Sequence, residues 1–172
     1  MSVAPPLTAI PVGVVVERSK AASRWADYIW RPIAVLAGQP GTPPWSRLTD
    51  DGQRATFYAG SAEIELHRTE TSNYRDNLAT GAPALWVVLR ETGTDPPYGL
   101  FLVTADPAEG EAMTEAGNDI VEPVPMPNSI RELVAAFILE HHVEHVFVKR
   151  KRDRANPEAF GRKPPALQRD EE

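Results

Sequence analysis

Apolar and polar residues alternate along much of the chain, as expected for β-strands with one buried and one exposed face. The alternation is clearest in two segments. In Ile10–Arg18, apolar side chains at every second position share one face. In Ser61–Arg68, apolar residues alternate with Glu63, Glu65 and His67. A strand with one such polar face is typical of an antiparallel sheet.

Further strands are predicted where β-branched and aromatic residues lie between turn residues. They span residues 28–36, 54–59, 83–91 and 98–104. The last two are expected to form a hairpin, and 83–91, apolar on both faces, is expected to be a central strand. Pro32 has no N–H to donate, so it should place its strand at an edge or at a bulge. Gly60 is expected to form a tight connection between two strands.

The period of the pattern changes after the last of these strands. Asp106 followed by Pro107 provides the side-chain acceptor and the fixed φ of a helix start, and Gly117 is expected to end this short helix. A helical turn could also form around 74–78. The proline-rich segment 118–127 should be extended and irregular.

The strongest helix signal lies near the C-terminus. Apolar residues follow the 3.6-residue period from Ile130 to His141, and Ser129 and Glu132 have the spacing of a capping box. We expect this helix to end near His145 and its apolar stripe to cover the sheet.

These segments together predict an α+β fold. It consists of a mainly antiparallel β-sheet of about six strands, covered by a C-terminal amphipathic helix, plus one short helix. The length of 172 residues suits a single domain. We expect a flexible N-terminus at 1–9, a single β-rich domain at 10–147, and a charged, loosely ordered tail at 148–172.

The composition excludes several classes of protein. The chain has no cysteine, so it has no disulfide, no thiol nucleophile and no cysteine metal site. This fits a reducing compartment, and we expect a cytoplasmic protein. Residues 1–8 lack the features of a signal peptide, and no apolar run is long enough to span a membrane. The motifs GxGxxG, GxxxxGK[ST], GxSxG and HExxH are missing, so we favour a protein without enzyme activity or cofactor.

One pattern does match a catalytic motif. His141, Glu144 and His145 have the H-x-x-E-H spacing of the inverted zinc peptidases. On a helix, the two histidines could share a metal ion, with Glu144 as the base of a hydrolase. A third ligand from a later helix is missing, and histidines near a helix C-terminus are favourable without any metal. We therefore favour the helix-end interpretation, with a metal-dependent hydrolase as the alternative.

Two other binding hypotheses remain open at this stage. Glu63, Glu65 and His67 on one strand face could bind a divalent cation, but the same pattern describes an exposed face, which we favour. A pocket between the last helix and the sheet could carry a small ligand, since such sites leave no short motif.

The net charge of −6 is unevenly distributed. From Lys149 onward there are eight basic and five acidic residues, which leaves ten basic and nineteen acidic residues in the rest of the chain. The basic cluster consists of Lys149, Arg150, Lys151, Arg152 and Arg154. Because the acidic domain would repel phosphate, we expect this cluster to be a solvated tail or to contact a protein, and not to bind a nucleic acid. Trp25 and Trp45 fall in predicted loops and would be anchors for a protein partner if they are exposed.

Several strings resemble an uncharacterised bacterial family, domain of unknown function 3305. They are IPVGVVVER, WADYIWRPIAVL, IELHRTETSNYRDNL, DIVEPVPMP and HHVEHVFVKRKRDR. The genes of this family are often found near formate dehydrogenase genes. The resemblance therefore implies an accessory role for a molybdenum-dependent formate dehydrogenase, with a redox-enzyme subunit or an assembly factor as the protein partner.

Overall fold

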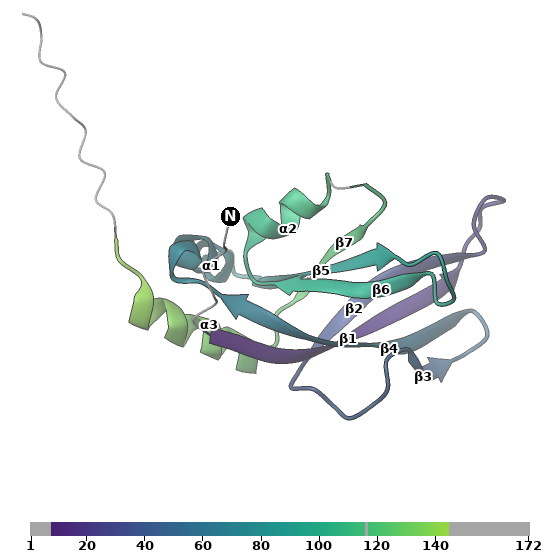
Figure 1. Cartoon of the computed structure of the whole chain (residues 1–172), viewed down its shortest axis with the longest axis horizontal. Helices are drawn as coiled ribbons and strands as arrows, with labels where there is room; N and C mark the ends of the chain where they lie inside the picture. Colours follow the sequence, from purple (N-terminus) through teal and green to yellow (C-terminus); the bar gives the residue numbers. More distant parts are fainter. Residues whose placement is uncertain (1–7, 116, 145–172) are drawn as a thin grey trace, which may run out of the picture.

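The computed structural model describes residues 8–115 and 117–144 and shows seven strands in two antiparallel sheets (Figure 1). The first sheet has the order β2-β1-β4-β3, and the second has the order β6-β5-β7. The strands are β1 (Thr8–Lys20), β2 (Tyr28–Ala37), β3 (Ser46–Asp50), β4 (Arg54–Leu66), β5 (Ala84–Glu91), β6 (Tyr98–Thr104) and β7 (Ile120–Pro125). The predicted α+β class is confirmed, as are the hairpin β5–β6 and the central place of β5 in its sheet. The prediction of one sheet with about six strands is corrected to two sheets with seven strands in the described residues.

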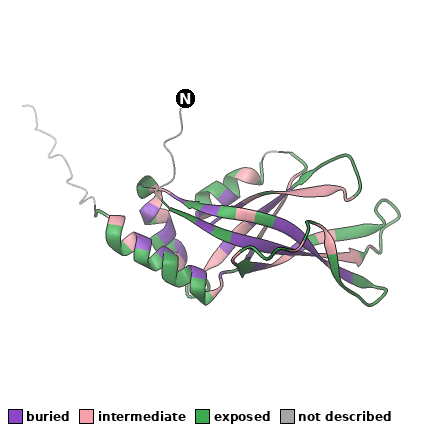
Figure 2. Cartoon of the chain, turned by 60° about the horizontal axis from the view of Figure 1, so that its bottom comes forward, coloured by how far each residue is buried: buried purple, intermediate pink, exposed green. Residues whose placement is uncertain are grey.

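The two sheets share one hydrophobic core. β6 lies beside β4 and β7 lies beside β2, so the apolar faces of both sheets meet. The fully buried residues of this core come mainly from β1, β4, β5, α1 and α3, and they include Val12, Val14, Ile64, Leu85, Val87 and Ile130. Figure 2 shows this buried layer between exposed outer surfaces. The apolar positions predicted from the first strand therefore form the core face.

Three α-helices and one 3₁₀ turn complete the fold. They are η1 (Arg68–Glu70), α1 (Thr71–Ala79), α2 (Pro107–Met113) and α3 (Asn128–His141). α1 and α3 lie against each other at one end of the sheets (Figure 1). In the described ranges, no helix has the length and apolar content to cross a membrane. The predicted tail at 148–172 lies outside the described residues.

Two predictions about the first sheet have different outcomes. Pro32 does lie in an edge strand, and the pairing of β1 with β2 shifts at this proline. The tight connection expected at Gly60 is wrong, because β4 continues through this residue. Gly60 has φ +138°, which its missing side chain allows, and the register against β1 shifts between Val14 and Val15. Gly60 thus belongs to a bulge, not to a turn.

The segment expected to be irregular contains strand β7. Its prolines, Pro123 and Pro125, alternate with residues whose backbone N–H groups point toward β5. Met126 N donates to Pro83 O at 2.9 Å, so even-numbered residues of β7 direct their N–H groups to β5. Pro123 and Pro125 occupy the alternate positions, where the backbone nitrogen points away from β5 and no N–H is needed for the ladder. This alternation allows an edge strand to contain two prolines.

The helix ends differ from those predicted. The N-cap of α3 is Pro127, whose carbonyl accepts from the N–H groups of Ile130 and Arg131, so the Ser129–Glu132 capping box does not form. The helix ends at His141, before the predicted end near residue 145, because the His142 backbone is extended. α3 is closest to α1, while its buried stripe joins the common core.

The start of α2 agrees with the sequence, but its end does not. Asp106 is the N-cap, and its side chain accepts from the N–H groups of Ala108 and Glu109. The helix ends at Met113, before Gly117, because the Thr114 N–H and hydroxyl both donate to the Glu111 carbonyl.

Candidate functional site: a basic and aromatic hairpin end

The end of the molecule opposite α1 and α3 carries the β5–β6 turn and two further hairpins, which form the candidate site (Figure 1). Residues 21–27 connect β1 to β2, and residues 51–53 connect β3 to β4. Lys20 N donates to Gln53 O at 3.1 Å and joins the two hairpins. Six of the ten Lys and Arg residues that precede residue 145 lie in or next to these hairpins: Arg18, Lys20, Arg24, Arg31, Arg47 and Arg54. We call this region the hairpin end.

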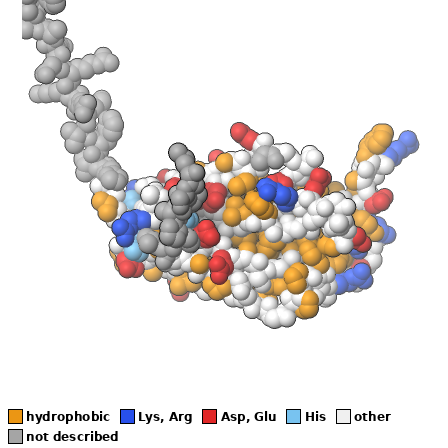
Figure 3. All heavy atoms as spheres, in the orientation of Figure 1, with side chains coloured by type: hydrophobic (Ala, Val, Ile, Leu, Met, Phe, Trp, Pro, Cys, Tyr) orange, Lys and Arg blue, Asp and Glu red, His pale blue; other side chains and the backbone are white. Residues whose placement is uncertain are grey.

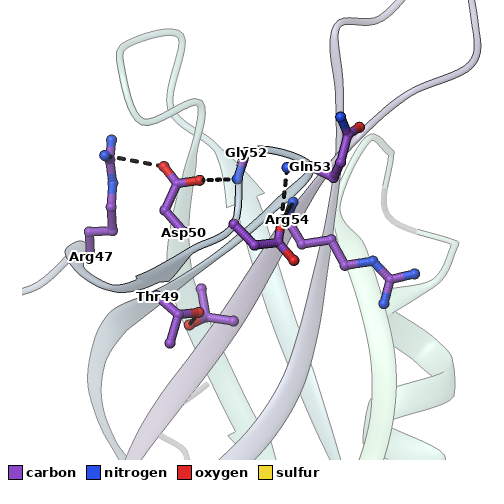
Figure 4. Close-up of polar contacts among 8 residues, drawn as sticks. Arg47, Thr49, Asp50, Gly52, Gln53 and Arg54 are labelled. Atoms are coloured by element: carbon purple, nitrogen blue, oxygen red, sulfur yellow. Dashed lines mark hydrogen bonds and ion pairs between the residues drawn. The ribbon is translucent and has the colours of Figure 1, made fainter.

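The turn between β3 and β4 is fixed by two aspartates (Figure 4). Asp50 Oδ1 accepts from Gly52 N at 2.9 Å, and Asp51 Oδ1 accepts from the N–H groups of Gln53 and Arg54 at 2.9 and 2.7 Å. These backbone donors lower the pKa of the Asp51 carboxyl, and the Arg54 N–H makes the largest contribution. The turn holds the charged Arg54 side chain in an exposed position.

An aromatic cluster fixes the base of the hairpin end. The Arg18 guanidinium lies over the rings of Tyr28, Phe57 and Trp30, at 4.3, 5.2 and 5.7 Å from their centroids. Trp30 also contacts Trp45 edge-to-face at 5.8 Å. Such stacking orders the long Arg18 side chain. The hairpin end is therefore a packed part of the protein that presents its own cationic and aromatic side chains.

Trp25 lies apart from this cluster, in the loop between β1 and β2. Its side chain is 95% exposed, whereas Trp45 is half-buried against Trp30. The loop is held by two hydrogen bonds, from Ala21 N to Asp27 O and from Trp25 N to the Ser23 hydroxyl, both at 3.1 Å. Of the two tryptophans singled out from the sequence, Trp25 is fully exposed, as an anchor for a protein partner must be, and Trp45 is not.

A family model matches residues 11–151, which include both hairpins and most of the chain. The chain belongs to the family DUF3305. The description of this family is "protein of unknown function". No curated protein matches the chain, and no solved structure matches it either. Membership of DUF3305 agrees with the resemblance of the sequence strings, and the hairpin end lies within the matched region.

In this DUF3305 chain the histidine motif lies at the opposite end. The His141 ring stacks on Phe137 with centroids 4.6 Å apart, and its Nε2 lies 3.6 Å from the Glu140 carboxylate. Glu144 Oε1 accepts from Arg75 Nη1 at 3.0 Å, so a cation on α1 already engages the proposed base. His145 lies outside the described residues, as does the whole basic cluster.

Sequence reasoning passed over His142, which connects α3 to α1. Its Nδ1 is 3.0 Å from the Thr71 hydroxyl, and its Nε2 is 3.0 Å from Arg75 Nη1. The H-x-x-E-H pattern singles out His141, Glu144 and His145. Its spacing does not indicate that His142 makes these contacts. This part of the chain acts as a junction between helices.

The polar face predicted on one strand is present on β4. Glu63 and Glu65 are both exposed, and His67 Nε2 lies 3.7 Å from the Glu65 carboxylate. Among residues 8–115 and 117–144, no three His, Asp or Glu side chains are grouped as a metal ion requires. Glu63 and Glu65 instead border a hollow between β4 and β6.

Proposed function

We propose that this DUF3305 protein is a non-enzymatic docking factor whose hairpin end binds an acidic surface of a partner protein. The observation that carries the proposal is the 95% exposure of Trp25 on an ordered loop. Tryptophan and arginine are the residues that most often dominate binding energy at protein interfaces. Both are present here, on one end of the molecule.

The charge of the hairpin end determines the kind of partner. The hairpin end carries six Lys and Arg residues and four acidic ones, Glu17, Asp27, Asp50 and Asp51, for a net charge of +2. The other residues before 145 include four basic and fifteen acidic ones, so an acidic partner is attracted to this end in particular. Arg24, which is also exposed, directly precedes Trp25 in the sequence. An apolar anchor at an end of net positive charge fits an acidic surface that contains an apolar pocket.

The partner class comes from the resemblance of the sequence. The family it resembles is encoded near formate dehydrogenase genes, so we propose a subunit or an assembly factor of a molybdenum-dependent formate dehydrogenase. A docking surface without a catalytic motif is consistent with that role.

The test is affinity purification of the full chain from its native host, at moderate salt and with nuclease. Three forms are compared: wild type, Trp25→Ala and Leu139→Ala. Leu139 is a matched control, because it is an apolar residue with 89% exposure on α3, at the other end of the molecule. We expect a formate dehydrogenase subunit or assembly factor to be retained by wild type and by Leu139→Ala, and to be lost with Trp25→Ala.

The affinity of the purified partner then gives a magnitude. Loss of a central tryptophan anchor costs about 2 kcal/mol or more, which corresponds to ~30-fold weaker binding. Equal affinity of the partner for Trp25→Ala and wild type would rule out the hairpin end as the docking surface.

A further inference from the structure

The edges of β4 and β6 border a hollow on the surface of the molecule. β3 pairs with β4 only over residues 55–58, so in the described part of the chain residues 59–66 have a hydrogen-bonded strand, β1, on one side only. β6 is the edge of its own sheet. The hollow between them has a volume of about 450 Å³ and is lined by Glu63, Glu65 and residues 100–103, among others.

A second hollow continues this one toward the α1 end. Its volume is about 400 Å³, and its lining includes His67, Glu70, Asp106 and Glu109. His67 connects the two hollows, because its ring contacts the Glu65 carboxylate at 3.7 Å. We call the combined surface the acidic groove. Figure 3 shows acidic side chains gathered on this face, toward the end that carries α1.

The carboxylates of the acidic groove are held by neutral donors. Asn73 Nδ2 donates to Glu70 Oε2 at 3.1 Å and to Asp106 Oδ2 at 3.2 Å, and the Thr104 hydroxyl donates to Glu109 at 2.5 Å. No Lys or Arg is among the residues that line the two hollows. Glu63, Glu65 and Glu109 are exposed and Glu70 is half-exposed, whereas Asp106 is buried and is the N-cap of α2. The charge of the four accessible carboxylates is therefore available to a cationic ligand.

The edge of β4 also offers backbone acceptors to long side chains. The Ala62 carbonyl accepts from Gln39 Nε2 at 3.1 Å, so a side-chain donor already reaches this edge. Lysine and arginine carry donors on stems of similar or greater length. Exposed strand edges are commonly covered in native proteins, since they otherwise pair with other chains. A basic, extended peptide would suit both the charge and the edges.

The described chain ends close to the acidic groove. His142 contacts Thr71, which directly follows the groove residue Glu70. Glu144 is bound to Arg75 on the same helix. The chain continues for 28 residues beyond Glu144, and the basic cluster begins five residues further on, within a reach of ~17 Å.

We propose that the acidic groove binds the basic cluster of its own chain, Lys149–Arg154. The five basic residues of the cluster are opposite in charge to the four accessible carboxylates of the groove. A tethered segment has an effective concentration on the order of mM, so it competes well against free basic partners. The hairpin end is itself basic and would repel the cluster. This contact is independent of the proposed docking function, because it uses the other end of the molecule.

The test uses a nitroxide spin label on the full chain. The chain has no cysteine, so Asn156→Cys provides a single attachment site two residues after the cluster. We expect the label to broaden the amide NMR signals of residues 61–67 and 100–106, and to leave those of residues 21–27 sharp. Broadening should largely disappear in ~1 M salt, where the screening length falls to ~3 Å from ~10 Å at 0.1 M.

A double substitution, Glu63→Gln with Glu65→Gln, should reduce the broadening, since it removes two charges from exposed positions. The matched control is Glu111→Gln with Glu115→Gln, two exposed residues outside the groove, and it should have no effect. Absence of local broadening, or equal effects of the two double variants, would overturn the proposal. So would broadening in a mixture of labelled protein with isotope-enriched, unlabelled protein, because the contact would then join two copies.

Discussion

Asn77 joins α1 to the second sheet, and its replacement by alanine should strongly destabilise the fold. The side chain is 2% exposed. Its Nδ2 donates to Ala84 O at 2.8 Å and to Ala105 O at 3.0 Å, and its Oδ1 accepts from Ala84 N at 3.1 Å. Three hydrogen bonds at a net ~1 kcal/mol each give a loss of about 3 kcal/mol. Ala105 is fully buried, so water cannot easily replace the partner of its carbonyl.

Urea denaturation of the full chain measures this loss. With a slope of ~1–3 kcal/mol per M, a loss of about 3 kcal/mol lowers the midpoint by ~1 M or more. Asn118→Ala is the control, because this exposed asparagine makes one long hydrogen bond of 3.5 Å, and it should stay within ~0.5 kcal/mol of wild type. A loss below ~1 kcal/mol for Asn77→Ala would refute the reasoning, since the three backbone groups would then have found other partners.

Two further predictions concern packing and ionisation. In Gly110→Ala, the added methyl group would lie 2.2 Å from Trp86 Cγ, so we expect a loss of ~1–3 kcal/mol in the same urea assay, against little change for Gly41→Ala, which has open space around it. Burial raises the pKa of Tyr74 from 10.0 to about 12, and the stability that this provides should be full below pH 10 and lost between pH 10 and 12. Melting temperatures of wild type and Tyr74→Phe test this point, and the idea fails if both fall equally over that range.

The sequence predicted best those strands that are stabilised by their own apolar face. β1 and β5 have clear patterns of this kind, and both lie in the interior of their sheets. β3 has no such pattern, since its five residues are exposed or half-exposed, and it forms because β4 offers a free edge. Its Thr49 hydroxyl pairs with Thr56 across the strands at 2.7 Å. Pairing between distant segments cannot be deduced from local periodicity.

The candidate sites also combine features that a local sequence pattern predicts with features that depend on contacts between distant segments. Trp25 was recognisable as a tryptophan in a loop, and its exposure follows from a short loop that offers it nothing to pack against. The stacking of Arg18 on Tyr28 and Phe57 needs three strands in register, which the sequence does not encode locally. Likewise, the polar face with Glu63 was predicted, but the groove needs β6 beside β4 without a ladder between them.

The domain is acidic on average, but it has a basic hairpin end and an acidic groove. The distance between these two surfaces makes the docking proposal and the groove proposal independent. β4 connects them, since Arg54 lies at the hairpin end and Glu63 borders the acidic groove. Nine residues of strand separate these two, which is ~30 Å. The screening length at physiological salt is ~8 Å, so charges at one end hardly affect the other. Energies of changes this far apart usually add. A weaker partner after Trp25→Ala therefore reports on the hairpin end alone, and a released tail after substitution of Glu63 reports on the groove alone.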